Sequence, residues 1–173
     1  QPKAGNISGC ITLCAEINPA AAYKRLEQGW VDACEADLDA LIARVRQAQA
    51  NKEVVALAYV GNIVDLWERL AEEGLFVHVG TDQTSLHNPW SGGYYPADYS
   101  FEQAQQLMQQ DPEAFKTAVQ ASLRRHVAAI ARHTERGTYF FDYGNAFLLE
   151  ASRAGADLKG EGEQEFRYPS YVQ

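Results

Sequence analysis

Apolar residues along the chain form short uninterrupted runs, and stretches of helical periodicity separate these runs. The runs at residues 11–17, 53–60, 75–82 and 138–142 contain many β-branched or aromatic side chains and are bounded by glycine or polar residues. Continuous apolar runs of this length are typical of strands buried on both faces. The pattern therefore predicts strands at these positions, the first of them ending at Glu16.

Helix start and stop signals fill the intervals between the strands. Asn18 and Asp111 are predicted N-caps, each followed by a proline in the first helical position. Ser100 is a third predicted cap, and Gly29 and Gly137 suit helix ends. The sequence predicts helices at residues 18–29, 35–50, 63–74, 100–110, 111–137 and 146–155. Residues 1–9 are consistent with a helix that packs closely through two glycines four residues apart.

Strands that alternate with helices predict an α/β fold with a mostly parallel sheet flanked by helices on both faces. The doubly wound, Rossmann-like nucleotide-binding type fits this order of elements. We expect one domain over residues 1–157. The polar tail at residues 158–173 is predicted to be a C-terminal extension or a crossover toward a further domain.

Composition narrows the class of partner. The net charge of −8 argues against nucleic acid or an anionic membrane as the main partner, and no apolar run is long enough to span a bilayer. Three cysteines without a CxxC pair (Cys10, Cys14 and Cys34) indicate reduced, buried packing thiols in a cytoplasmic protein. Because the chain begins with Gln1, we expect it to be part of a longer polypeptide.

Chemistry is expected outside the carboxyl ends of the strands, where ligands bind in such folds. Glu16, the Gly61–Asn62 turn, the loop "TDQTSLHNPWSGGYYP" and the turn "DYGN" all fall there. A carboxylate at a strand end can accept hydrogen bonds from ribose hydroxyls, and helix starts can hold phosphate. The glycine-rich phosphate loop of dinucleotide-binding folds is missing and is expected to precede Gln1.

The histidines divide by their surroundings. His87 lies in the polar loop and is expected to take part in a site. His126 and His133 stand seven residues apart on the longest helix without a third ligand, so no metal site is predicted. His78 is expected to be a core or edge residue of its strand.

Several long motifs resemble the urocanase (urocanate hydratase) family in the same order along the chain. They are "QPKAGNISGCITLCAEINP", "YVGN", "TDQTSLHNPWSGGYYP", "SLRRHVAAI" and "FDYGNAFLLEASRAGAD", which together extend to Asp157. The resemblance implies a central Rossmann-like domain that binds NAD⁺ tightly. In this family the nicotinamide ring acts as an electrophile toward urocanate, and water addition gives 4-imidazolone-5-propanoate.

The resemblance also implies which residues bind the cofactor. Glu16 corresponds to the acidic residue expected on the adenosine ribose, and Ala21 replaces an arginine of some members, for which Arg25 is a substitute. The cofactor-binding residues that it implies are Glu16, Asn62, Ile63, Gln83, Thr84, Ser85, Leu86, His87, Tyr94, Tyr95 and Tyr143. It implies no catalytic residue in this chain, because the reactive cysteine and several groups that bind urocanate lie in the C-terminal part of the family's proteins.

The resemblance further implies N- and C-terminal urocanase domains and a homodimer at full length. We expect the chain alone to be inactive and to bind NAD weakly. Two alternatives are an NAD-dependent dehydrogenase domain, which would transfer a hydride, and a non-catalytic nucleotide-binding module.

Overall fold

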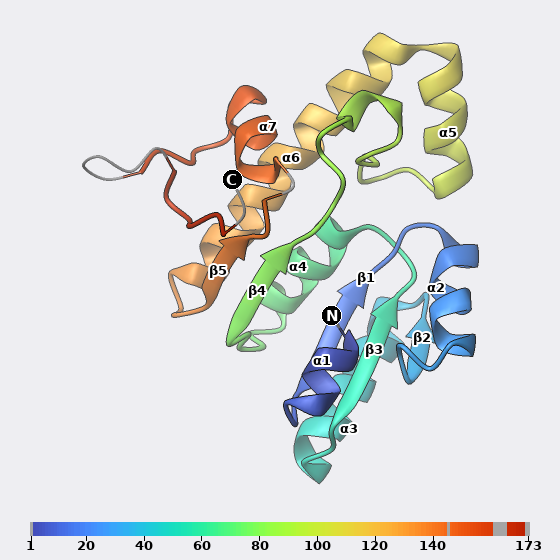
Figure 1. The fold of residues 1–173 in the computed structure, drawn as a ribbon, viewed down its shortest axis with the longest axis vertical. Helices are drawn as coiled ribbons and strands as arrows, with labels where there is room; N and C mark the ends of the chain where they lie inside the picture. The colour runs from blue at the N-terminus through green and yellow to red at the C-terminus, as the bar shows by residue number, and fades with distance from the viewer. Residues whose placement is uncertain (1, 145, 161–165, 172–173) are drawn as a thin grey trace. The chain divides into compact units, whose positions relative to one another are not determined.

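The structure, a computed structural model, describes residues 2–144, 146–160 and 166–171. The chain forms two compact units, Gln1–Arg69 (unit 1) and Leu70–Gln173 (unit 2) (Figure 1). Each unit has parallel strands and helices, which confirms the predicted α/β class. The predicted strands nevertheless pair in two separate sheets, one in each unit.

Unit 1 alternates strands and helices from its first element onward. Its elements are α1 (Pro2–Ile7), β1 (Ile11–Ala15), α2 (Pro19–Glu27), β2 (Ala33–Glu35), α3 (Leu38–Asn51), β3 (Val55–Tyr59) and α4 (Ile63–Glu72). Helix α4 runs across the boundary between the units.

The sheet of unit 1 has the order β1-β3-β2, and both strand pairs are parallel. All five residues of β3 are buried, as predicted for a strand covered on both faces. Strand β1 was also expected to be buried, but each of its residues is only half-buried. The reason is its position, because β1 is an edge strand of this sheet.

Strand β2 is absent from the sequence-based prediction, which began a helix at Glu35. Helix α3 begins at Leu38 instead, because Oδ1 of Asp37 accepts a hydrogen bond from the amide of Ala40 at 2.8 Å. Glu35 is the last residue of β2 and lies opposite Tyr59 of β3. Three residues are too few for a periodicity to indicate a strand, so only pairing with β3 reveals it.

Of the two glycines predicted to pack closely, Gly5 lies in α1 and does so, whereas Gly9 follows the helix and a Cβ there would meet nothing within 4 Å. A Cβ atom on Gly5 would lie 1.7 Å from Oγ1 of Thr12 in β1, so a larger residue would separate the helix from the strand. Asp32 links α1 to strand β3, since its Oδ2 accepts from Nδ2 of Asn6 at 2.9 Å and from the amide of Ala56 at 2.8 Å. The N-terminal residues are thereby fixed to the sheet of unit 1.

Unit 2 contains a two-stranded parallel sheet and the longest helix. Its elements after α4 are β4 (Val79–Asp82), the 3₁₀ helix η1 (Pro89–Ser91), α5 (Phe101–Gln110), α6 (Pro112–Thr134), β5 (Tyr139–Asp142) and α7 (Phe147–Arg153). The predicted caps Asn18, Ser100 and Asp111 are confirmed, since each side chain accepts from a backbone amide of its helix.

Strand β4 is shorter than the predicted strand at residues 75–82. Gly74, with a φ of +66°, ends α4, and the amide of Leu75 still bonds to the carbonyl of Leu70 at 3.1 Å. Pairing with β5 starts only where the carbonyl of His78 accepts from the amide of Tyr139 at 3.0 Å. His78 is therefore an exposed residue that precedes the strand, and not part of it.

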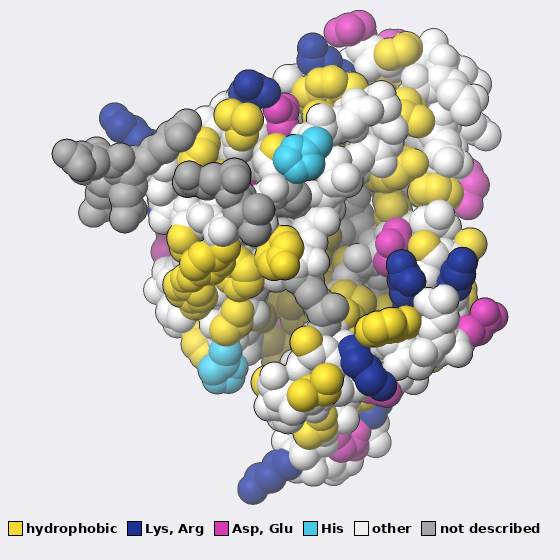
Figure 2. All heavy atoms as spheres, in the orientation of Figure 1, with side chains coloured by type: hydrophobic (Ala, Val, Ile, Leu, Met, Phe, Trp, Pro, Cys, Tyr) yellow, Lys and Arg dark blue, Asp and Glu magenta, His cyan; other side chains and the backbone are white. Residues whose placement is uncertain are grey.

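The two faces of the β4–β5 sheet differ. Phe140 is buried and packs near Phe147 of α7, with ring centroids 6.1 Å apart. On the opposite face, Tyr139 and Phe141 are partly exposed and contact Tyr171. Figure 2 shows hydrophobic side chains gathered over this part of unit 2.

The tail packs against β5. Leu158 and Tyr168 are buried, and the amide of Asp142 donates to the carbonyl of Pro169 at 2.9 Å. The described part of the expected extension at residues 158–173 therefore belongs to unit 2. Its continuation toward a further domain stays a prediction.

Candidate functional site

The carboxyl ends of the three strands of unit 1 lie at one edge of its sheet. Backbone hydrogen bonds continue past the strands there: the amide of Glu16 donates to Tyr59 at 2.9 Å, and the amide of Gly61 donates to Glu16 at 3.1 Å. The amide of Val60 donates to Glu35 on the other side at 2.8 Å. Glu16 and the Gly61–Asn62 turn are therefore neighbours, as predicted.

The side chain of Glu16 is aimed toward the start of α2. Its Oε1 accepts from the amide of Asn18 at 2.9 Å, while Asn18 caps α2 through the amides of Ala20 and Ala21. The positive end of a helix dipole favours a carboxylate at this position. The side chain of the half-buried Glu16 is therefore held at the start of α2 by its hydrogen bond with the amide of Asn18.

Gly61 allows a close approach that other residues would prevent. A Cβ atom there would lie 2.3 Å from Cζ of Tyr59, whose ring turns back over the glycine. Burial, followed by the charges of Asp65 and Asp37, raises the pKa of Tyr59, so its hydroxyl stays neutral. Glycine at this position therefore leaves room for the ring of Tyr59 against the turn.

Asn62 and Ile63 form the start of α4. Oδ1 of the buried Asn62 accepts from the amide of Val64 at 2.9 Å, which caps the helix. Ile63 is the first helical residue. The first amides of a helix have no partner within the helix, and Asn62 provides one of them with an acceptor.

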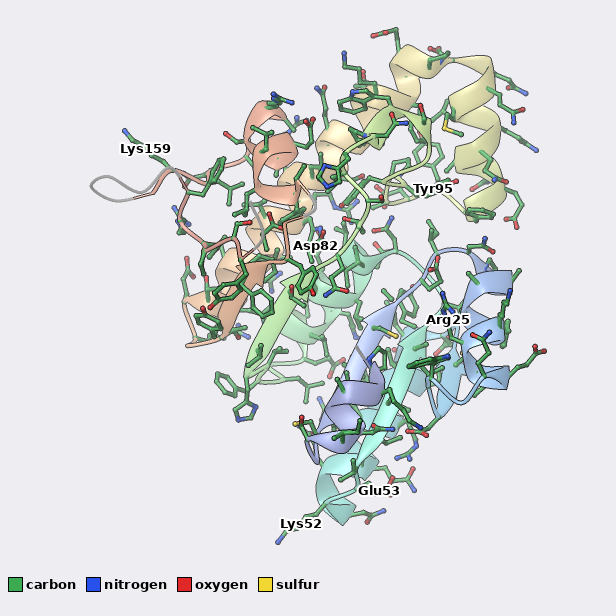
Figure 3. The ribbon with its side chains drawn as sticks, viewed as in Figure 1. Arg25, Lys52, Glu53, Asp82, Tyr95 and Lys159 are labelled. Carbon is green, nitrogen blue, oxygen red and sulfur yellow. The ribbon has the colours of Figure 1, made fainter. Side chains whose placement is uncertain are left out.

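In unit 2, the two strands end in a pair of buried aspartates. Asp82 and Asp142 are opposite each other in the β4–β5 register, and each is 3% exposed. Oδ1 of Asp82 accepts from the amide of Thr84 at 3.0 Å and from its hydroxyl at 2.6 Å. Figure 3 labels Asp82 at the end of its strand.

The polar loop that follows β4 folds back on itself. The carbonyl of Asn88 accepts from the amide of Gly93 at 3.2 Å, and Gly92 has a φ of +85°. A Cβ atom on Gly93 would lie 2.1 Å from the carbonyl oxygen of Ser85. The loop therefore brings its second half against residues 85–88, with no room for a side chain between them.

The predicted loop residues differ in exposure. Gln83, Ser85 and His87 are exposed and Thr84 is half-buried, so their polar groups are accessible. The side chain of Leu86 is 1% exposed and packs in the core of unit 2. For Leu86, only the backbone is in a position to contact a ligand.

The two tyrosines that end the loop have packing roles in this structure. Tyr94 is 2% exposed, and its hydroxyl lies 3.2 Å from Nδ1 of the buried His126. The ring of Tyr95 packs against Phe101 and Phe115, with centroids 5.1 and 6.5 Å away. The implied contact of Tyr94 with the cofactor therefore stays a prediction for its backbone, because its side chain is buried inside unit 2.

Tyr143 follows β5 and remains accessible, with 54% of its surface exposed. The amide of the next residue, Gly144, donates to Oδ1 of Asp142 at 3.1 Å. Tyr143 thus lies at the same edge of the β4–β5 sheet as the start of the polar loop. Asn145 of the "DYGN" turn lies outside the described residues.

Other candidate ligands and nucleophiles are placed differently from the predictions. Cys10 was expected to be buried but is exposed, because it precedes β1 and does not belong to it. Burial raises the pKa of Cys14 to about 11, consistent with an unreactive packing thiol. Within the described ranges, no group of three or more His, Cys, Asp or Glu side chains is arranged to hold a metal.

The predicted residues therefore form one group in each unit. Glu16, Asn62 and Ile63 meet at the strand ends of unit 1, and residues 83–87 and Tyr143 start from the strand ends of unit 2. The substitute for the missing arginine, Arg25, lies on α2 and donates to Oε1 of Gln28 at 3.1 Å. Asp82 and Asp142 lie in motifs that the sequence placed at the strand ends, but the sequence assigned neither of them a role.

Parallel strands joined by helices, with polar groups at their carboxyl ends, define the class of a Rossmann-like α/β domain. The sequence profile of the urocanase Rossmann-like domain matches residues 1–173. The chain belongs to this family.

Relatives of the chain carry the name urocanate hydratase or probable urocanate hydratase. The chain is 57% identical to urocanate hydratase of Mus musculus and 54% identical to that of Homo sapiens, over 100% of the chain and 27% of each relative. It is 52% identical to a probable urocanate hydratase of Dictyostelium discoideum, of which it covers 26%. The chain thus spans about a quarter of the length of these relatives. None of its described helices is long and apolar enough to cross a membrane.

Proposed function

We propose that this chain is the NAD-binding domain of a urocanate hydratase, the hydro-lyase that adds water to urocanate to give 4-imidazolone-5-propanoate. The observation that carries the proposal is the edge of unit 1, where Glu16 adjoins both the start of α2 and the Gly61 turn before α4. The names of the relatives supply the reaction, and the edge supplies the reason for a dinucleotide.

The groups at this edge fit a dinucleotide chemically. A carboxylate accepts hydrogen bonds from two adjacent ribose hydroxyls, and helix N-termini bind phosphate. Gly61 leaves room for the ring of Tyr59, which lies against the turn between Glu16 and α4. When bound, NAD⁺ supplies an electrophilic nicotinamide ring, while the protein supplies position and electrostatics.

The proposal assigns a contact to each predicted residue. Glu16 accepts from the ribose, and the backbone at Asn62 and Ile63 lies near the dinucleotide. In unit 2, the cofactor contacts come from the side chains of Gln83, Thr84, Ser85, His87, Tyr95 and Tyr143. Leu86 and Tyr94 contribute backbone contacts, because their side chains are buried.

This chain covers only 26–27% of the length of its relatives, so the proposal also concerns the remainder of the protein. We infer that N- and C-terminal urocanase domains complete the enzyme, that urocanate binds with their help, and that the whole is a cytoplasmic homodimer. The free cysteines support a reducing compartment. Residues 1–157 form the cofactor domain in this proposal, with residues 158–173 leading toward the next domain.

Calorimetry with NAD⁺ on the full-length polypeptide that carries this chain tests the proposal. Glu16→Gln keeps the oxygen that accepts from Asn18 but removes the charge. Loss of a charged hydrogen bond is expected to weaken NAD⁺ binding about tenfold, with little change in melting temperature. Glu27→Gln, an exposed position at the end of α2, is the matched control and should bind as wild type.

The loss of the ultraviolet absorbance of urocanate measures turnover. Absence of NAD⁺ binding by the full-length polypeptide contradicts the proposal. Hydride transfer to the cofactor, seen as NADH absorbance with a reduced substrate, would instead support a dehydrogenase.

A further inference from the structure

Asp82 and Asp142 are buried side by side at the strand ends of unit 2. They are directly opposed in adjacent parallel strands, so their side chains leave the same face of the sheet, and each is 3% exposed. Buried acidic side chains require hydrogen-bond partners. The hydrogen bonds that the two side chains accept therefore show which segments they hold.

Both carboxylates bind the turn that follows their own strand. Oδ1 of Asp82 accepts from the amide of Thr84 at 3.0 Å, and Oδ1 of Asp142 accepts from the amide of Gly144 at 3.1 Å. The Thr84 hydroxyl adds a second bond to Asp82 at 2.6 Å. The same local geometry thus occurs twice, side by side, at the point where each strand ends.

Asp142 is also held from the tail. Its Oδ2 lies 3.4 Å from Oγ of Ser170, and its backbone bonds to Pro169 and Tyr171 at 2.9 and 3.1 Å. The second turn is therefore fixed on two sides. Asp82 and Asp142 are both hydrogen-bonded through backbone or side-chain groups that belong to unit 2.

We propose that Asp82 and Asp142 are positioning residues, which fix the starts of the two segments that carry the cofactor contacts of unit 2, residues 83–87 and Tyr143. This inference rests on the proposed function, because it takes those segments to contact NAD⁺. An oxygen acceptor two residues before each amide is the essential feature, and the negative charge is not.

Calorimetry with NAD⁺ on the full-length polypeptide tests the inference through the choice of replacement. Asp82→Ala removes the acceptor for two hydrogen bonds and should weaken NAD⁺ binding by about tenfold or more. Asp82→Asn keeps Oδ1 and should restore binding to near the wild-type value. The pair Asp142→Ala and Asp142→Asn should behave in the same way.

Asp111 provides a matched control in the same unit. Its Oδ1 accepts from the amide of Ala114 at 3.0 Å, the same kind of bond at the start of α6. Asp111→Ala should lower the melting temperature but leave the affinity for NAD⁺ unchanged. A merely structural role of Asp82 would make the two alanine variants indistinguishable in affinity, and that result overturns the inference.

Hydrogen exchange keeps the test decisive if Asp82→Ala folds poorly. Asp82→Asn in the same polypeptide should keep slow exchange at residues 83–87, and Asp82→Ala should speed exchange there before the rest of unit 2. Binding by Asp82→Asn that is as weak as in the alanine variant also overturns the inference. Failure of the wild-type polypeptide to bind NAD⁺ overturns the proposed function instead, and the inference with it.

Discussion

In unit 1 the polar groups follow the strands at once, whereas in unit 2 most of them lie in a long loop. Glu16 and Gly61 are bonded to each other through backbone at 3.1 Å, so the sheet itself sets their geometry. The loop after β4 relies instead on the Asp82 turn and on Gly93, which packs its two halves together. The strand ends of unit 1 are therefore held by strand pairing, whereas the loop at the strand ends of unit 2 is held by local turns.

This difference predicts where single substitutions do most damage. A strand end tolerates change when the neighbouring ladder persists, while a loop closed by a few contacts depends on each of them.

Gly93→Ala should be the most damaging change in unit 2. The new methyl group would lie 2.1 Å from the carbonyl oxygen of Ser85 and 2.6 Å from that of Asn88, and backbone cannot yield as a flexible side chain can. We expect a loss of about 3 kcal/mol or more in the free energy of unfolding. Chemical denaturation measures this loss.

Gly74→Ala is its control. Gly74 has a φ of +66°, but a Cβ there would meet nothing within 4 Å, so only backbone strain of about 1 kcal/mol is expected. Equal losses for the two variants would show that the two halves of the loop do not depend on close contact at Gly93.

Gly61→Ala should have a smaller effect in unit 1. Its methyl group would meet the ring of Tyr59 at 2.3 Å, and a ring can rotate away where a carbonyl cannot. We expect a loss of about 1–2 kcal/mol, measured by thermal unfolding. In a Tyr59→Leu background the same substitution should cost less, since the atoms that it meets are gone.

A loss that is unchanged by Tyr59→Leu would contradict this account of Gly61. It would place the constraint in the backbone of the turn, as in the loop of unit 2, and the contrast between the units would weaken.

Substitution of Asp32 should have the smallest effect on stability, and this effect should depend on pH. Hydrogen bonds from the amide of Ala56 and then from Asn6 lower the pKa of this exposed carboxyl. A lowered pKa in the folded state adds stability above the ordinary aspartate pKa, and this stability is lost as the pH falls through the folded value. Asp32→Ala should therefore destabilise unit 1 slightly at neutral pH, and the difference from wild type should shrink in acid.

Melting temperatures from neutral to strongly acidic pH test this expectation, with Asp37→Ala as a control. Asp37 caps α3 and shows how the loss of a different backbone bond behaves. A difference at Asp32 that grows as the pH falls would contradict the sign of the effect.

Much of the architecture was predictable because local physics decides it. The caps at Asn18, Ser100 and Asp111 act within their own helices, and the apolar run of β3 reports burial on both faces. Strand β2 and the true start of β4 were not predictable, because both depend on hydrogen bonds to a distant strand.

The sequence by itself determined the α/β class, the helix boundaries set by caps and glycines, and, through long shared motifs, membership of the urocanase family. Only the tertiary structure decided which residues of the polar loop stay accessible, and that Tyr94 and Leu86 turn inward. It also decided that Asp82 faces Asp142. The physical reason is that caps and apolar runs act between near neighbours in sequence, whereas burial and strand register depend on segments far apart in the chain.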